Sequence, residues 1–239
     1  MIKQALGSAR DVWSGVLDLI YPPCCLVCGK AGDEYLCADC LEKVDTIGPR
    51  HCSKCGMPDD GMVCRDCRER EYAFDSACSA GTFDGVLQTA IHKFKYRNHI
   101  VLADPLGDLL YRCFADAHLT GKVDVVIPVP IHKSRMVERG FNQAIELAKR
   151  FCKRTSLPLN TGILIKHRNT PHQVNLRQEI RLTNVRDAFT VVNVENVSGK
   201  RVLLVDDVFT TGSTLHEAAK ALKAAGASQV HAYTLARSL

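Results

Sequence analysis

Apolar and polar positions follow a block pattern from about residue 81 to the end of the chain. Short apolar, β-branched runs predict strands, and longer runs with apolar residues three or four positions apart predict helices. We expect strands at 123–130, 159–166, 188–192, 201–207 and 229–236, and helices over 84–118, 140–155 and 213–226. The first helical stretch should break near Asn98 and Pro105. Strands that alternate with helices predict the α/β class, with a doubly wound parallel sheet.

The first 71 residues follow a different pattern. Apolar residues near helical spacing over 2–20 predict an amphipathic helix within 1–23, docked on the rest of the protein and ended by Pro22 and Pro23. Apolar runs then disappear until about Tyr72. The expected organisation is therefore a helix at 1–23, a small domain at 24–71 and the α/β domain at 72–239.

Two stretches of the small domain share one cysteine spacing, C-x2-C-x8-C-x2-C, at an offset of 27 residues. The glycine after the second cysteine repeats too, as Gly29 and Gly56. Four thiolates from two such knuckles form the closed tetrahedral site of structural zinc, with no open position for catalysis. Reduced core cysteines or dithiol redox chemistry explain an eight-position repeat less well. The expected zinc ligands are Cys25, Cys28, Cys37 and Cys40, and Cys52, Cys55, Cys64 and Cys67.

The sequence predicts an intracellular protein with reduced cysteines. The amino-terminal segment lacks the apolar core of a signal peptide, and no stretch approaches the ~18 apolar residues of a membrane span, so we expect a cytoplasmic location and metal ligands rather than disulfides. Cys24 lies outside the repeat as a spare thiol, or replaces Cys25. Cys78, Cys113 and Cys152 lie in apolar contexts typical of a core.

Net charge is a weak guide to partners here. The formal value is +5, with cysteine counted as neutral. Eight thiolates and two Zn²⁺ would reduce it to about +1. Local clusters of charge are therefore more informative than the total.

The stretch VLLVDDVFTTGST, at 202–214, combines a buried strand with two adjacent carboxylates and a loop of small hydroxyl residues. Backbone N–H groups where the following helix begins suit a phosphate, and Gly212 allows close approach. Asp206 and Asp207 would repel that phosphate, but they suit a diol when a bound cation offsets the charge. Ribose 5-phosphate carries both groups. No Walker loop is present.

This stretch resembles the signature of type I phosphoribosyltransferases for phosphoribosyl pyrophosphate (PRPP), which binds with Mg²⁺. The resemblance implies that Asp206 and Asp207, the catalytic-site pair, hold the ribose hydroxyls. It places the 5-phosphate at Val208, Thr210, Thr211, Gly212, Ser213 and Thr214. It places pyrophosphate beyond the first core strand, at the backbone of Val129, Ile131 and His132 and the side chains of Lys133, Arg135 and Arg139. A catalytic lid would occupy 167–186, including Arg168, Gln173 and Arg177.

The whole chain resembles the ComF family, which includes GntX-like and ComFC-like proteins. The resemblance is carried by the cysteine domain, FKYR at 94–97, PVP to RGFNQ at 128–143, and the PRPP signature. It implies a role in competence, DNA uptake and DNA utilisation. One hypothesis is transfer of a 5-phosphoribosyl group to an unnamed acceptor, with release of pyrophosphate. The other is a non-catalytic PRPP-sensing module that binds single-stranded DNA or DNA-uptake proteins.

Two basic stretches leave their role open. Lys93, Lys95 and Arg97 alternate with Phe94 and Tyr96, which suits single-stranded nucleic acid, although a solvated helix end explains the pattern equally well. The segment 166–186 carries five basic residues against one Glu, and could close on pyrophosphate or contact a phosphate backbone.

Overall fold

The computed structural model describes residues 24–59, 62–168 and 187–239. The chain forms two compact units, residues 1–43 and 44–239, and each is described by itself. The amphipathic helix expected at 1–23 lies outside the described residues. The division falls between the two cysteine repeats, so the second repeat belongs to the larger unit. That residues 24–71 form one domain stays a prediction.

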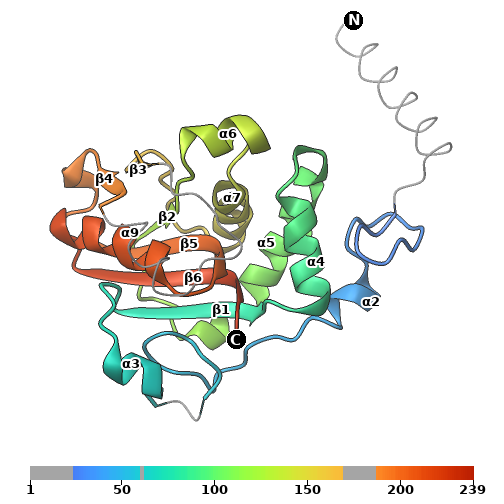
Figure 1. The fold of residues 1–239 in the computed structure, drawn as a ribbon, viewed down its shortest axis with the longest axis horizontal. Coiled ribbons are helices and arrows are strands. Elements are labelled where there is room, and N and C mark those ends of the chain that lie inside the picture. Colours follow the sequence, from blue (N-terminus) through green and yellow to red (C-terminus); the bar gives the residue numbers. More distant parts are fainter. Residues whose placement is uncertain (1–23, 60–61, 169–186) are drawn as a thin grey trace, which may run out of the picture. The chain divides into compact units, whose positions relative to one another are not determined.

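The larger unit is built on a four-stranded sheet with the order β1-β6-β5-β2, in which all neighbouring strands are parallel (Figure 1). The strands are β1 (Ser76–Thr82), β2 (Val125–Pro128), β5 (Arg201–Phe209) and β6 (Gln229–Arg237). The parallel sheet is confirmed. The sequence pattern missed β1, because its residues, SACSAGT, are small and contain no run of large apolar side chains.

Helices cover both faces of this sheet, which confirms the doubly wound class (Figure 1). Helices α5 (Ala103–Arg112) and α7 (Gln143–Thr155) pack on one face, and α9 (Ser213–Ala224) packs on the other. The chain also forms α4 (Gly85–Phe94), α6 (Lys133–Arg139), and the short 3-10 turns η1 (Arg97–Leu102), η2 (Ala115–Ala117) and η3 (Val194–Asn196).

The break expected near Asn98 occurs, because α4 ends at Phe94 and η1 follows. The same break reaches the neighbourhood of Pro105, because η1 ends at Leu102 and α5 begins at Ala103. Pro105 lies in the first turn of α5, where a missing N–H removes no helical hydrogen bond.

The expectation for 159–166 was too long. Only β3 (Leu164–Lys166) is a strand, and it pairs antiparallel with β4 (Phe189–Val191) in a separate two-stranded sheet. The Gly162 N–H donates to the side chain of Asn160 at 3.1 Å, and this turn ends the extended run. Leu159 retains a single parallel bridge to Val126.

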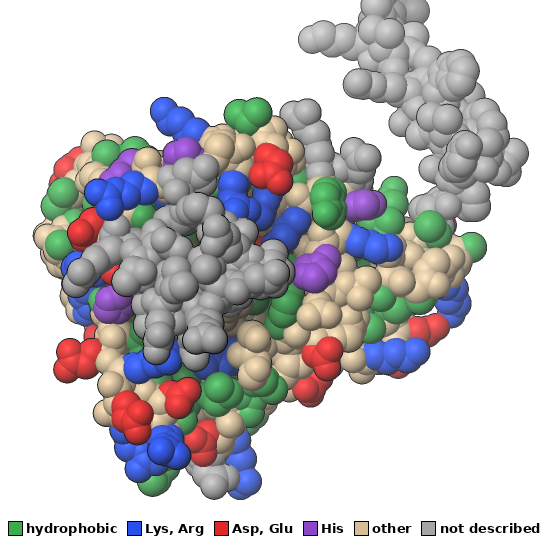
Figure 2. Space-filling view, viewed as in Figure 1, with side chains coloured by type: hydrophobic (Ala, Val, Ile, Leu, Met, Phe, Trp, Pro, Cys, Tyr) green, Lys and Arg blue, Asp and Glu red, His purple; other side chains and the backbone are tan. Residues whose placement is uncertain are grey.

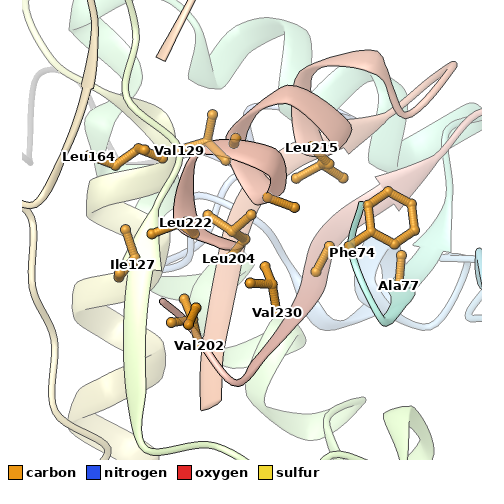
Figure 3. Packing of buried hydrophobic residues seen from close by; sticks show 14 of the residues in the cluster. Phe74, Ala77, Ile127, Val129, Leu164, Val202, Leu204, Leu215, Leu222 and Val230 are labelled. Atoms are coloured by element: carbon orange, nitrogen blue, oxygen red, sulfur yellow. The ribbon is translucent and has the colours of Figure 1, made fainter. Parts of the chain in front are cut away.

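The core between the sheet and α9 gathers side chains from all four strands of the sheet (Figure 3). Leu215 and Leu222 of α9 lie over Val202 and Leu204 of β5 (Figure 3). Cysteines 52, 55 and 64 of the second repeat are buried in the same cluster. The second repeat is therefore part of the core that supports β5.

Phe94 and Tyr96 allow a test of which aromatic residue of the stretch 91–99 contributes to the hydrophobic core. Phe94 is fully buried against Phe141, with 5.5 Å between ring centroids, whereas Tyr96 is 68% exposed. Phe94→Ala should lower the free energy of unfolding by about 3–5 kcal/mol, because it leaves a cavity. Tyr96→Ala should change it by less than about 0.5 kcal/mol. Urea unfolding of both variants measures the difference, and equal values would contradict the assignment of Phe94 to the core.

Candidate functional site

The two aspartates lie within the carboxyl-terminal part of β5 rather than after it. The ladder with β6 continues to Phe209, two residues beyond the expected end. It pairs Asp206 with Thr234 and Val208 with Ala236, so the sheet holds the backbone on both sides of Asp207. The Asp207 N–H donates to Asp206 Oδ1 at 2.8 Å. Asp207 Oδ2 lies 3.5 Å from Lys95 Nζ, an ion pair in which both side chains are largely buried. The sheet therefore holds two adjacent carboxylates in fixed positions.

The electrostatics of the pair are unusual. Burial and the neighbouring Asp207 carboxylate raise the pKa of Asp206 to about 8, while Lys166 and Lys95 act in the opposite direction. Burial also lowers the pKa of Lys166, an effect that Asp206 opposes and Arg135 reinforces. Lys95, which follows α4, and Lys166 of β3 thus bring two cations to the carboxylates. Burial and the neighbouring carboxylate thus disfavour the charged form of Asp206 in the absence of a ligand.

The loop after β5 forms as predicted and leads into α9 at Ser213. Gly212, the N-cap of α9, adopts φ +76° and has no side chain. The Ser213 N–H donates weakly to Thr211 Oγ1 at 3.4 Å, and the other N–H groups of the first turn are oriented toward an anion that binds at the loop. The Thr211 and Ser213 hydroxyl oxygens are 2.7 Å apart. A Cβ at Gly212 would lie 2.7 Å from Phe209 Cζ and 2.9 Å from Tyr72 Cε1. Glycine is therefore required both by the backbone conformation and by the rings behind the loop.

The segment after β2 differs from the expected arrangement. The Val129 N–H donates to the Val205 carbonyl at 2.8 Å, so the sheet uses this donor and it is not available to pyrophosphate. The N–H groups of Ile131 and His132 form no hydrogen bond within the described ranges. The His132 ring instead caps α6 by accepting from the Ser134 N–H at 3.2 Å.

The basic residues expected for pyrophosphate lie on α6, a helix that the sequence pattern did not reveal. Lys133 is exposed, and Arg135 is partly buried, which lowers its pKa. Arg139 Nη1 donates to Gln143 Oε1 at 2.9 Å, where α7 begins. The Asn142 side chain accepts from the Ala144 N–H and donates to the Val129 carbonyl, which ties α7 to the end of β2. Arg168, from the expected lid, is exposed, while Gln173 and Arg177 lie outside the described residues.

Lys95 and Lys166 lie beside the two aspartates, although nothing in their local sequence indicates this position. In the stretch 91–99, Phe94 belongs to the core and Lys95 pairs with Asp207, so the alternation of basic and aromatic residues is not a continuous surface. Lys166, at the end of β3, lies near Asp206. No local signal in the sequence connects either lysine with the aspartates.

The two cysteine clusters have the geometry of tetrahedral zinc sites. In each cluster the four sulfurs lie within 4.8 Å of one another, and the distances Cys25–Cys40, Cys28–Cys37 and Cys55–Cys64 are 3.7 Å. A tetrahedron with Zn–S bonds of about 2.3 Å has edges of about 3.8 Å, whereas a disulfide bond is about 2.05 Å long. The eight residues present therefore fit zinc, with four ligands from each repeat.

Backbone N–H groups lower the pKa of one cysteine in each cluster, Cys25 and Cys52, whereas burial raises the pKa of Cys40, Cys55 and Cys67. Cys37 N–H donates to Cys25 Sγ at 3.5 Å, and Cys64 N–H donates to Cys52 Sγ at 3.3 Å. Burial raises the pKa of Cys25, but backbone N–H groups outweigh it and bring the pKa to about 6. Cys24 is exposed and does not belong to the cluster, so the reading of Cys24 as a spare thiol holds.

The surroundings of the two clusters differ. The first, in the smaller unit with α2 (Ala38–Leu41), leaves Cys28 exposed. The second, with α3 (Arg65–Glu69), is packed on β1, where a Cβ at Gly56 would lie 2.6 Å from the Ala77 carbonyl oxygen. A Cβ at Gly29 would have no other atom within 4 Å. The second cluster alone is thus built into the sheet of its unit.

None of the helices in the described ranges is long and apolar enough to cross a membrane. The phosphoribosyl transferase domain family matches residues 98–239, and the double zinc ribbon family matches residues 16–79.

The chain is 31% identical to competence protein F of Haemophilus influenzae, over 85% of this chain and 90% of the relative. It is 31% identical to competence protein ComFC of Bacillus subtilis, over 67% and 63% of the two chains. It is 31% identical to the DNA utilization protein YhgH of Escherichia coli O157:H7, over 64% and 68%.

Among solved structures, glutamine PRPP amidotransferase from B. subtilis, complexed with ADP and GMP, is 28% identical over 57% of this chain and 27% of that chain, with a TM-score of 0.38. The phosphoribosyl transferase match covers more than half of the residues, and competence protein F aligns over most of both chains. The chain therefore belongs to the ComF family, in which a phosphoribosyltransferase-like domain is joined to an amino-terminal double zinc ribbon.

Proposed function

We propose that this chain binds PRPP with Mg²⁺ and transfers its 5-phosphoribosyl group to an acceptor, with release of pyrophosphate, during the use of incoming DNA. One observation carries the proposal. A single strand–loop–helix presents paired carboxylates and a phosphate loop, and the cations of Lys95 and Lys166 lie near the carboxylates. The role in DNA use follows from the names of the relatives, and the reduced thiols favour the cytoplasm.

Each part of PRPP has a matching group in this arrangement. The 5-phosphate would accept hydrogen bonds from the N–H groups and hydroxyls of 210–214, and the ribose diol would donate to Asp206 and Asp207. The N–H groups of Ile131 and His132, which form no hydrogen bond within the described ranges, would hold the pyrophosphate together with Arg135. Basic and histidine side chains gather in the upper part of the face in Figure 2, where Figure 1 places α6.

In the proposed reaction, the bond between the anomeric carbon and the pyrophosphate oxygen breaks, and a nucleophile of the acceptor bonds to that carbon. Negative charge then grows on the leaving pyrophosphate. Arg135 and Lys166 are fixed cations, partly shielded from water, and stabilise such charge more effectively than exposed ones. Mg²⁺ supplies further neutralisation of that charge when it is bound.

A second candidate is a PRPP-sensing module that binds single-stranded DNA or DNA-uptake proteins without turnover. Tyr96 favours it, because this ring is 68% exposed and follows Lys95 in the chain. An aromatic surface beside basic groups is the usual platform for an unpaired base.

Both cysteine clusters should hold zinc. Elemental analysis of the purified chain should give two Zn per chain, because each cluster has the edge lengths of a Zn–S tetrahedron. Cys40→Ser should lower this value to about one, since it removes a ligand from the first cluster only. Cys24→Ser is the matched control and should leave it at two. A single zinc in the unaltered chain would refute the two-site assignment.

The diol assignment predicts a selective loss of affinity. Changing both Asp206 and Asp207 to Asn keeps their shape but weakens two charge-assisted hydrogen bonds, each contributing about 1.5–3 kcal/mol. PRPP affinity measured by calorimetry should therefore fall by roughly 10²- to 10⁴-fold. Inorganic phosphate has no diol and should bind as well or better. Equal weakening of both ligands would mean that the aspartates act only through the fold or the local field.

The raised pKa of Asp206 also predicts how the stability of the protein depends on pH. Because its folded pKa is raised to about 8, Asp206 adds stability that is complete below its ordinary pKa and is lost as pH rises through about 8. The unaltered chain should lose more stability between pH 6 and pH 9 than Asp206→Asn, which resembles the protonated carboxyl. Denaturant unfolding with zinc present at both pH values compares them, and identical losses would contradict the burial of this group.

Turnover separates the enzyme from the sensing module. The full chain is incubated with Mg²⁺, PRPP and panels of bases, amines and oligonucleotides, and pyrophosphate is measured. The proposal expects release with at least one acceptor class, and loss of that release in the double Asn variant. Salt-sensitive DNA binding without any release would favour the module instead.

A further inference from the structure

A cavity of about 400 Å³ lies between the second cysteine cluster and the phosphate loop. Its walls include Cys55, Cys64 and Cys67 on one side and Phe209, Thr210 and Thr211 on the other. The lining also includes Arg70, Tyr72 and Arg237, together with Met57, Asp66, Ser238 and Leu239. The cluster and the loop therefore face a common space within the larger unit, although they are about 150 positions apart in the chain.

Arg237 crosses from the cluster to the loop. It lies at the end of β6 and is only 4% exposed. Its Nη1 donates to the Cys55 carbonyl at 2.6 Å, and its Nη2 donates to Cys55 Sγ at 3.5 Å. Its guanidinium also lies over the Phe209 ring, 4.2 Å from the centroid. One side chain thus contacts both a zinc ligand and the residue that precedes the loop.

Phe209 continues this chain of contacts. Its ring, with that of Tyr72, occupies the space where a side chain at Gly212 would lie. The Tyr72 hydroxyl donates to the Thr211 carbonyl at 3.2 Å. The two rings therefore fix the back of the phosphate loop, opposite the N–H groups of the first turn of α9. A shift of Phe209 would change the conformation at Gly212.

The positive charge of the buried Arg237 side chain needs an opposite charge, which the metal-loaded cluster would supply. Among the described residues, Arg237 forms no ion pair with a carboxylate, and its Nε is buried without a hydrogen-bond partner. A buried cation without an opposite charge is costly. Four thiolates with one Zn²⁺ carry a charge of about −2 and would supply it. Four neutral thiols would not.

We infer that the second zinc cluster holds the phosphate loop in its binding conformation through Arg237 and Phe209, so that metal at this cluster and phosphate at the loop favour each other. Arg237 is a positioning residue in this scheme. The first cluster, in the other compact unit, makes no part of it. The inference rests on the proposed function in taking 210–214 as the phosphate site.

Arg237→Met tests the link in the full, zinc-loaded chain, because Met keeps much of the volume without the charge. We expect zinc to stay at two per chain, amide hydrogen exchange to become faster in peptides that cover 209–216, and affinity for PRPP with Mg²⁺ to fall about 5- to 150-fold. Arg237→Lys should recover part of the affinity, since it keeps the charge. The control is Arg201→Lys at the other end of β5, where Arg201 pairs with Asp124 at 2.7 Å and neither measurement should change.

The 27-residue repeat supplies a matched pair of cluster variants. Cys40→Ser and Cys67→Ser remove equivalent ligands from the first and second clusters. Each should lose one zinc, but only Cys67→Ser should speed exchange over 209–216 and weaken PRPP binding. Exchange in peptides that cover β6 reports whether the fold of Cys67→Ser persists.

Unchanged loop exchange in Arg237→Met, or equal effects of the two cysteine variants, would overturn the inference. Hydrogen exchange needs no ligand, so this result is independent of PRPP. A chain that shows the coupling but does not bind PRPP would overturn the proposed function alone.

Discussion

The site depends on the electrostatic cost of placing two carboxylates on consecutive residues of a partly buried strand. β5 cannot separate Asp206 from Asp207, because the ladder with β6 pairs Asp206 and Val208 and so fixes the backbone on either side of Asp207. The cost is reduced in two ways. Asp206 has a pKa raised to about 8 by burial and by its neighbour, and Asp207 pairs with Lys95. This arrangement favours a ligand that brings both hydroxyl donors and positive charge.

The sheet order gives this pair its surroundings. Because β5 lies between β6 and β2, the segments that follow β5 and β2 emerge at the same edge, where open α/β sheets bind their ligands. The loop at 210–214 and helix α6 are therefore neighbours of one site. Lysines from α4 and β3 reach the carboxylates from outside the sheet.

The two cysteine repeats show how one local motif serves two environments. Their spacing and sulfur geometry are the same, but Gly29 faces open space and Gly56 is packed on β1. The first cluster lies in the smaller unit. The second is continuous with the core under β5, and Arg237 extends it to the phosphate loop.

Features whose cause is local could be predicted from the sequence alone. The cysteine spacing determines two four-sulfur sites, because each knuckle and its ligands lie within 16 residues. The order of apolar runs determines a parallel α/β sheet, and the run at 202–214 determines a strand, a carboxylate pair and a helix start. Strand β1 was not predicted, because it is formed by small residues. Helix α6 was not predicted, because its residues form no apolar stripe.

What depends on contacts between distant segments was decided only by the tertiary structure. Lys95 pairs with Asp207 and Lys166 lies near Asp206, because packing brings distant segments together. For the same reason the Val129 N–H donates to the Val205 carbonyl in the sheet. Arg237 meets Cys55 for the same reason. Local sequence encodes backbone conformation and ligand spacing, but the partner of a buried charge depends on which elements the core holds side by side.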